Sequence, residues 1–343
     1  MMNSDERFMR EALREARKGI GQTSPNPAVG AVLVSRNRIV ARGHHRKAGL
    51  PHAEVECLKR LKRGVPKDAL LYVTMEPCSS VGRTGPCTNE IVRSGVRTVV
   101  IGATDPNPRH RGQGIEILRG AEIEVRSGVL AEECARLNEA FNKWIATGIP
   151  LVIAKCGMSL DGRLTRPKRE GRWLTSYAAR QHAQKLRAES DAIMVGAETV
   201  RIDNPKLTVR GMRGARQPIR VVVTRSGNLP RNARIFTDRH GKRTLVYTNE
   251  PLAAVLADLG KKDVTSVTIE GGGNVLGHAL DQRLIDMVQI YLAPIFAGGA
   301  VLAFAGEGAQ STAQGARLER IRFEKIGPDL CVIGYPKYAA AAA

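Results

Sequence analysis

The chain has 343 residues, and its 53 Lys and Arg outnumber its 33 Asp and Glu to give a formal net charge of +20. This length suits two domains of ordinary size better than one. The longest apolar runs fall short of the roughly 18 residues that a membrane span requires. Six cysteines are too few for a disulfide framework, so we expect a cytoplasmic protein in a reducing compartment, without a membrane partner.

The positive charge raises nucleic acid as a partner, but its distribution argues against one. The basic residues are dispersed in short clusters, and aromatic residues make up only 4% of the chain, which leaves few platforms for base stacking. Anionic small molecules would equally favour a positive field, and a merely solvated basic surface is a further alternative. We therefore expect no nucleic-acid partner.

The first half of the chain alternates helices with strands. A helix is predicted to begin at Ser4, and others are predicted over residues 52–61, 88–94 and 112–119. Strands are predicted over residues 28–34, 38–41, 70–75, 96–101 and 122–126. This alternation predicts a mostly parallel sheet that helices cover on both faces.

A second domain is predicted to follow the Gly and Pro breakers in residues 146–150, because a fresh strand is expected over residues 151–156. The predicted domains are therefore residues 1–148 and residues 149–338. The alanine tail, residues 339–343, receives no function.

His52, Cys78 and Cys87 predict a zinc site. Zinc held by one nitrogen and two thiolates keeps its fourth tetrahedral position open for a water, whose pKa it lowers to about 7. Glu54 follows His52 by two residues and can carry the water's proton to a departing ammonia without binding the metal. Zinc nucleobase deaminases share this His-x-Glu and Pro-Cys-x-x-Cys signature, although eight residues separate the two cysteines here.

The alternative is that these residues merely fill a core, since free cysteine is among the most buried residue types. The predicted strand over residues 70–75 favours the interpretation as a metal site over core packing, because it would place Glu76, Pro77 and Cys78 together at its end. The other four cysteines are predicted to be packing residues: Cys57, Cys134, Cys156 and Cys331.

The chain resembles the RibD family of bifunctional riboflavin-biosynthesis deaminase-reductases over nearly its whole length. In the first half the resemblance rests on residues 25–30, His45, and residues 48–54, 74–79, 82–84, 86–87 and 105–108. It implies a cytidine-deaminase-like three-layer α/β/α domain, in which Asn26 and Ala53 contact the pyrimidine. Asn26 lies between two prolines, so it also suits a simple turn.

The second half resembles the family's reductase domain, which is similar to dihydrofolate reductase and has an α/β fold. The motifs are residues 155–163, 173–176, Arg187, residues 191–196, Thr199, and residues 203–210 and 270–274. A glycine triplet, residues 271–273, follows a predicted strand over residues 266–269 and precedes a helix. Such a turn exposes backbone amides to a phosphate, but it also serves as a plain connector.

The resemblance implies NADPH as the second cofactor. The residues expected to bind it are Gly157, Trp173, Thr199, Asp203, Gly272, Gly273 and Asn274. The residues expected to bind the reductase substrate are Lys155, Arg187, Leu207, Arg210 and Glu270. The cations suit phosphate and hydroxyl groups, Glu270 can accept from the pyrimidine edge, and Lys155 is a hypothetical proton donor. Surface solvation of the cations and core packing of Trp173 are the alternatives.

Two departures from the family are expected to alter contacts. Ser80 and Val81 stand where the family usually has histidine or bulky polar and aromatic residues, and Gly85 stands where proline is common. Gly171 replaces a common serine contact near Trp173.

The implied function is two consecutive steps on one intermediate. The first domain, with one zinc ion per chain, would deaminate 2,5-diamino-6-ribosylamino-4(3H)-pyrimidinone 5′-phosphate. The second would use NADPH to reduce the ribosyl side chain to ribityl, and the family implies a homo-oligomer, either a dimer or a tetramer. The rival is a transfer-RNA deaminase with an accessory domain, which would share the zinc residues but would not need the second half. A reductase with a degenerate metal domain and a non-enzymatic binding module are further alternatives.

Overall fold

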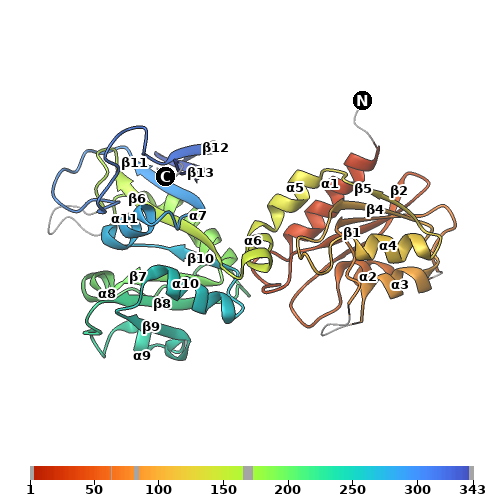
Figure 1. The fold of residues 1–343 in the computed structure, drawn as a ribbon, viewed down its shortest axis with the longest axis horizontal. Helices are drawn as coiled ribbons and strands as arrows, with labels where there is room; N and C mark the ends of the chain where they lie inside the picture. The colour runs from red at the N-terminus through yellow and green to blue at the C-terminus, as the bar shows by residue number, and fades with distance from the viewer. Residues whose placement is uncertain (1–3, 63, 81–84, 165–172, 340–343) are drawn as a thin grey trace. The chain divides into compact units, whose positions relative to one another are not determined.

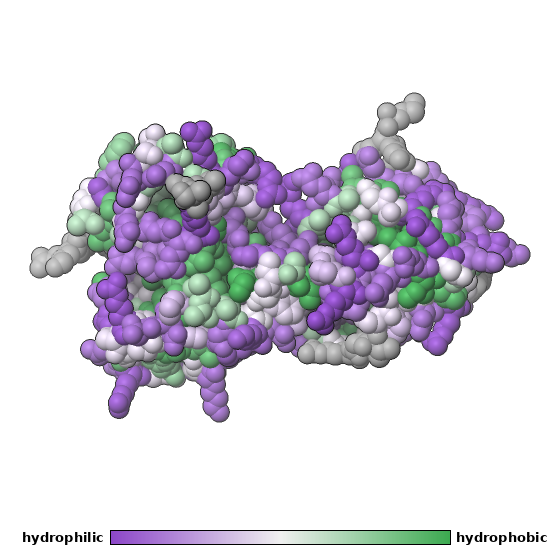
Figure 2. Space-filling model, in the orientation of Figure 1, coloured by the Kyte–Doolittle hydropathy of each residue, from purple (hydrophilic) through white to green (hydrophobic). Residues whose placement is uncertain are grey.

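The computed structural model describes residues 4–62, 64–80, 85–164 and 173–339. The chain divides between Gly148 and Ile149 into two compact units. Within the described ranges, no helix combines the length and the apolar character that a membrane crossing needs. Hydrophilic residues predominate on the visible surface of each unit (Figure 2).

The N-terminal unit has a five-stranded sheet in the order β2-β1-β3-β4-β5. Its strands are β1 (Gly30–Ser35), β2 (Arg38–His44), β3 (Leu70–Met75), β4 (Thr98–Ala103) and β5 (Glu124–Ser127). Its helices are α1 (Ser4–Arg17), α2 (Ala53–Leu58), α3 (Cys87–Ser94), α4 (Gln113–Gly120), α5 (Ala131–Leu137) and α6 (Glu139–Thr147). The predicted strand over residues 70–75 is confirmed at both ends.

The prediction of a mostly parallel sheet is wrong for this unit. Strand β1 pairs antiparallel with both β2 and β3, whereas β3, β4 and β5 are parallel. The physical reason is the short connection between β1 and β2. Arg36 and Asn37 both adopt positive φ, 48° and 60°, which is typical of a tight hairpin turn that reverses the chain. A parallel pair would require a crossover of a dozen or more residues.

Helices cover both faces of this sheet (Figure 1). Alternate residues of β1 point to opposite sides, so Ala31 and Leu33 pack with residues of α2, α3 and α4. Val32 and Val34 pack with residues of α1 and α5. This alternation follows from the two-residue period of a strand. It produces the expected three-layer α/β/α arrangement.

The C-terminal unit has an eight-stranded sheet in the order β12-β13-β11-β6-β10-β7-β8-β9. Its strands are β6 (Leu151–Ser159), β7 (Ala192–Gly196), β8 (Ile219–Thr224), β9 (Thr244–Thr248), β10 (Ser266–Ile269), β11 (Met287–Ala293), β12 (Arg317–Ile326) and β13 (Asp329–Lys337). Its helices are α7 (Tyr177–Glu189), α8 (Ala197–Asp203), α9 (Arg234–Thr237), the 3₁₀ helix η1 (Gly241–Arg243), α10 (Leu252–Lys261) and α11 (Gly273–Asp281).

The centre of this sheet is parallel, and β12 and β13 form an antiparallel hairpin at one edge. One face packs on α10 and α11 through a core that includes Val152, Met194 and Leu256. On the other face, Ile193 and Val222 pack with residues of α8 and α9. Because the central strands are parallel, their carboxyl ends meet at one edge, where ligands of open α/β sheets usually bind.

Candidate functional site

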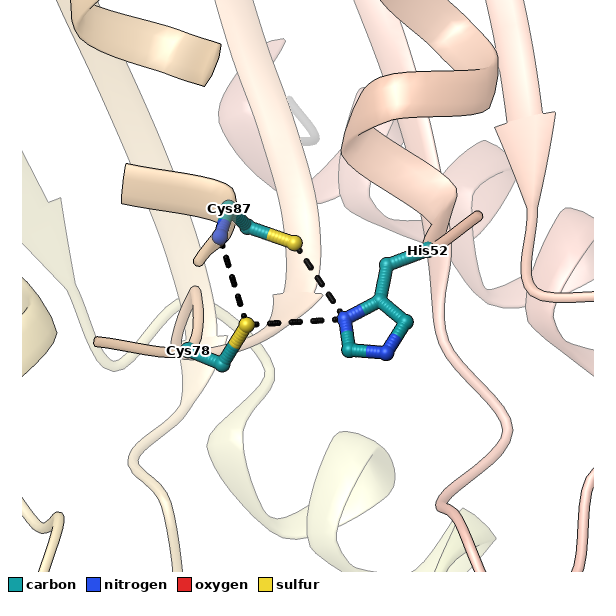
Figure 3. A group of neighbouring side chains, drawn as sticks. All are labelled: His52, Cys78 and Cys87. Carbon is teal, nitrogen blue, oxygen red and sulfur yellow. Dashed lines mark hydrogen bonds between the residues drawn. The ribbon is translucent and has the colours of Figure 1, made fainter. Parts of the chain in front are cut away.

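The structure brings together the three predicted zinc ligands from separate elements (Figure 3). His52 is the N-cap residue of α2, Cys87 is the first residue of α3, and Cys78 lies in the loop that follows β3. His52 Nδ1 lies 3.5 Å from Cys78 Sγ and 3.2 Å from Cys87 Sγ. The ligand atoms of all three residues lie within 4.8 Å of one another.

These distances fit a tetrahedral metal. Zinc bonds of about 2.3 Å to sulfur and 2.1 Å to nitrogen would separate the two kinds of ligand atom by about 3.6 Å. Hydrogen bonds from Cys87 and His52 lower the pKa of the Cys78 thiol, and the Cys87 backbone N–H donates to Cys78 Sγ at 3.3 Å. Both effects favour the thiolate that a metal requires. The arrangement can therefore hold zinc.

Glu54 has the environment of a proton carrier. Its side chain is buried, and its Oε2 atom has no hydrogen-bond partner among the residues described. Burial raises the pKa of Glu54 to about 7, because removal from water disfavours the charged carboxylate. A carboxyl group with such a pKa can accept and release a proton near neutral pH.

Asn26 reaches the zinc-ligand cluster through His45. The ring of His45 stacks edge-on against His52, with 5.0 Å between ring centroids. His45 Nδ1 donates to the Pro51 carbonyl at 3.1 Å, so Nε2 can accept from the Asn26 side-chain amide at 3.2 Å. Burial lowers the pKa of His45, which favours this neutral tautomer. His45 was not predicted as a site residue, although it lies in one of the motifs that carry the family resemblance.

A second cluster of charged side chains lies in the C-terminal unit. Arg187 on α7 forms a forked pair with Glu270, the residue after β10, through contacts of 2.6 Å and 2.5 Å. Lys155 Nζ on β6 lies 3.9 Å from the same carboxylate. Burial alone would raise the pKa of Glu270, but the charges of Arg187 and Lys155 offset this and hold it below its usual value. Glu270 is therefore a buried, ionised acceptor.

The ion pair between Arg187 and Glu270 leaves Arg187 and Arg210 in different surroundings. Arg187 is largely buried and also donates to the Thr208 carbonyl at 3.2 Å, so much of its charge and donor capacity is used within the protein. Arg210 is exposed to solvent. The part of its guanidinium surroundings that excludes water, and then the positive charge of Arg187, lower its pKa. Leu207 is buried. Arg210 is thus better placed than Arg187 to meet an anionic ligand from solvent.

The predicted cofactor residues are brought together only in part. Gly272 adopts a φ of 80°, and a Cβ added there would lie 3.4 Å from Thr199 Oγ1, so Thr199 and the glycine triplet are neighbours. A Cβ on Gly273 would lie 1.9 Å from the Leu302 carbonyl oxygen. Chain packing therefore explains this glycine without a ligand. Asn274 is exposed.

The remaining cofactor candidates have other described surroundings. A Cβ on Gly157 would lie 3.0 Å from the Thr175 methyl group. Trp173 is 50% exposed, and the Arg180 guanidinium lies 5.1 Å from its ring centroid, so core packing of this tryptophan is excluded. Asp203 is the last residue of α8 and is exposed.

Comparisons with known proteins account for both units. Residues 2–103 match the family model for the cytidine and deoxycytidylate deaminase zinc-binding region, and residues 150–332 match the RibD C-terminal domain. The riboflavin biosynthesis protein RibD of Bacillus amyloliquefaciens is 37% identical over 97% of this chain and 96% of its own length. The chain belongs to the RibD family.

Two solved structures extend the RibD likeness to the fold. RibD of Acinetobacter baumannii has a TM-score of 0.90 at 34% identity, covering 97% of this chain and 99% of that one. A Thermotoga maritima protein described as a diaminohydroxyphosphoribosylaminopyrimidine deaminase and 5-amino-6-(5-phosphoribosylamino)uracil reductase has a TM-score of 0.87 at 33% identity, with the same coverage.

Membership of the RibD family decides the function. The chain is a bifunctional enzyme of riboflavin biosynthesis, with an N-terminal deaminase domain of the zinc-binding type and a C-terminal reductase domain. The enzyme acts on a pyrimidine. The rival of a transfer-RNA deaminase is not favoured, because RibD relatives match both halves of the chain.

The noted departures from the RibD pattern are only partly visible. Ser80 is exposed, and Gly85 faces open space. Val81, residues 82–84 and Gly171 lie outside the described residues. The four cysteines expected to be packing residues are all buried and free, which confirms that prediction: Cys57, Cys134, Cys156 and Cys331.

Proposed function

We propose that residues 1–148 bind one zinc ion per chain at His52, Cys78 and Cys87, and that Glu54 is the catalytic acid-base. The substrate proposed is 2,5-diamino-6-ribosylamino-4(3H)-pyrimidinone 5′-phosphate. The convergence of one ring nitrogen and two sulfurs beside a buried carboxyl group supports this most directly.

When bound, zinc supplies a Lewis acid that makes water nucleophilic near neutral pH. Glu54 takes the proton from the attacking water and returns it to the departing amino group, for which its raised pKa is suited. Asn26 donates to His45, so its Oδ1 atom is left to accept from the pyrimidine. Ala53 is the first residue of α2, and its backbone amide has no acceptor within that helix.

For residues 149–338 we propose an NADPH-dependent reduction of the ribosyl side chain to ribityl. Thr199 and the turn of Gly272, Gly273 and Asn274 would hold the cofactor phosphates at the start of α11. Gly157, Trp173 and Asp203 would complete the cofactor site. NADPH supplies the hydride, while the protein supplies orientation and charge.

We propose that Arg210 meets the substrate phosphate, with Leu207 beside it. Glu270, held by Arg187, would accept from the pyrimidine, and Lys155 would donate a proton to the opening ribose. Lys155 Nζ lies 3.9 Å from the buried Glu270 carboxylate, which places it beside the group proposed to hold the pyrimidine. The alanine tail, residues 339–343, has no proposed role.

The test is Glu54→Gln in the full chain. We expect the variant to keep its zinc and its NADPH oxidation with the deaminated substrate, while ammonia release falls by about 10²–10⁴-fold. The matched control is Glu56→Gln, since Glu56 lies on the same helix but pairs with Arg46. Undiminished ammonia release in the Glu54 variant would remove this residue from the mechanism.

We propose further that the protein is cytoplasmic, because free thiolate ligands require a reducing compartment, and that it is a homo-oligomer. Ile321 and Phe323 on β12 and Leu330 on β13 are exposed, which supports a contact between copies. Light scattering after size-exclusion chromatography tests the oligomer, and a purely monomeric mass would contradict it.

A further inference from the structure

Glu76 is a buried carboxylate whose side-chain oxygens, in the contacts of the described residues, accept hydrogen bonds from backbone N–H groups alone. It is the first residue after β3, and 5% of it is exposed. Its Oε2 atom accepts from the amides of Asp105 and Gly112, each at 3.0 Å. Its Oε1 atom accepts from Gly114 at 2.9 Å and Ile115 at 3.4 Å.

These four donors come from the loop after β4 and from the first turn of α4. The Glu76 amide also donates to the Ala103 carbonyl at 2.8 Å, which joins the ends of the adjacent strands β3 and β4. The carboxylate therefore ties the chain just before Cys78 to a segment that lies 29 to 39 residues away in sequence.

The other side of Cys78 contacts the same helix. Ser79 Oγ donates to Gln113 Oε1 at 3.4 Å. A Cβ added to Gly114 would lie 2.2 Å from the Pro77 carbonyl oxygen, so α4 approaches this segment as closely as a backbone without a side chain allows. Glu76, Pro77 and Ser79, which surround Cys78 in sequence, are all fixed by the start of α4.

We propose that Glu76 is a positioning residue for the metal site, which holds the chain just before Cys78 against the start of α4 and thereby sets the affinity for zinc. This inference rests on the proposed function of His52, Cys78 and Cys87 as zinc ligands. Residues outside the ligand set that orient a ligand typically change metal affinity or activity by about 10–100-fold when they are replaced.

The chemistry requires a carboxylate at this position. Two ionised oxygens accept about four hydrogen bonds, whereas a glutamine has one accepting oxygen and an NH₂ group that only donates. In Glu76→Gln, two buried backbone amides would face that NH₂ group without an acceptor. The negative charge also lies at the start of α4, where the helix dipole favours an anion.

The experiment measures the zinc dissociation constant of the full-length chain by chelator competition, for wild type, Glu76→Gln and the control Glu116→Gln. Glu116 is exposed on α4, so its replacement makes the same charge change without touching Cys78. We expect Glu76→Gln to bind zinc about 10–100-fold more weakly, to regain ammonia release when zinc is saturating, and to reduce the deaminated substrate with NADPH at the wild-type rate. The control should match wild type.

A second pair of variants protects against a folding defect in Glu76→Gln. Gly114→Ala keeps the carboxylate but pushes α4 away from Pro77, whereas Gly120→Ala on the same helix meets nothing within 4 Å. We expect only Gly114→Ala to weaken zinc binding. Wild-type zinc affinity in both Glu76→Gln and Gly114→Ala, or activity lost in both and not regained with zinc, would overturn the inference. A wild-type protein that binds no zinc would instead overturn the proposed function.

Discussion

The two units assemble their candidate sites in different ways. In the deaminase unit, the metal-ligand atoms come from residues 52 to 87 and converge within 4.8 Å. In the reductase unit, the charged side chains come from β6, α7 and the end of β10, and Arg187 and Glu270 already neutralise each other across 83 residues of sequence. The first site gathers side chains that suit a metal ion, whereas the second has a preformed internal ion pair.

This difference indicates which interactions depend on a ligand. Two thiols and an imidazole gain most of their interaction energy only when a metal binds. A buried Arg-Glu pair is largely satisfied without substrate, and it is costly only when one partner is removed. We therefore expect changes in the first site to affect chemistry and changes in the second to affect stability as well.

The largest expected effect is on the metal site. Cys87→Ser should remove zinc and reduce ammonia release to background, because one of three protein ligands is lost. NADPH oxidation with the deaminated substrate should remain, since that site lies in the other unit. Cys57→Ser is the control, as Cys57 is a buried thiol on α2 outside the ligand cluster. Zinc analysis and ammonia assays on both variants measure this effect. Zinc retained in Cys87→Ser would contradict the contrast between the two sites.

The ion pair should dominate stability in the reductase unit. Arg187→Met should lower the free energy of unfolding of this unit by about 3–5 kcal/mol, because the buried Glu270 carboxylate loses its hydrogen-bonded partner. Lys155, at 3.9 Å, is then the nearest cation. Arg201→Met is the control, since Arg201 pairs with Glu198 at an exposed site and should cost about 0–1 kcal/mol. Denaturation followed by a signal from the C-terminal unit measures both. Equal losses would show that burial of the pair contributes nothing.

The pH dependence of stability sharpens the same point. The pKa of Glu270 lies below its usual 4.5 in the folded protein, so the unfolded chain binds more protons in the window between the two values. The stabilisation is therefore complete above about pH 4.5 and is lost as the pH falls through the folded value. Glu270→Gln should show a smaller loss of stability in this acid range. Thermal unfolding between pH 3 and pH 6 measures the slopes, and identical slopes would contradict the assignment.

The smallest expected effect is at a helix cap near the reductase residues. Ser176 Oγ accepts from the Ala179 amide at the start of α7, the helix that carries Arg187. Ser176→Ala should cost about 0.5–2 kcal/mol of unfolding free energy and leave ammonia release unchanged. Ser80→Ala, at an exposed position of the deaminase unit, should change stability by less than about 0.5 kcal/mol. A larger loss from Ser80→Ala would assign that serine a role in the deaminase unit.

The candidate zinc ligands could be predicted from the sequence because their signal is local. The residue types, their neighbours and the strand at residues 70–75 are all visible in the printed chain, and the strands Leu70–Met75 and Ser266–Ile269 have the predicted bounds. The ends of other predicted elements differ from the observed ends by one to three residues. The strand predicted over residues 96–101, for example, runs from Thr98 to Ala103. Element ends depend on tertiary contacts as well as on local pattern.

The direction of strand pairing was predicted incorrectly because the alternation of helices and strands outweighed one short turn. Arg36 and Asn37 are the whole connection between β1 and β2, so they require a hairpin. The spacing of residues 35–37 between the two predicted strands was the available signal.

By itself, the sequence determined the family, the two-domain organisation of the chemistry and the metal-binding residue types, since these follow from residue identity and spacing. Only the tertiary structure decided that Arg187 pairs with Glu270, that His45 orients Asn26 and that Glu76 holds the start of α4. The physical reason is that a polar side chain can satisfy its hydrogen bonds with many partners, and its choice is set by which distant segments packing brings within about 3 Å.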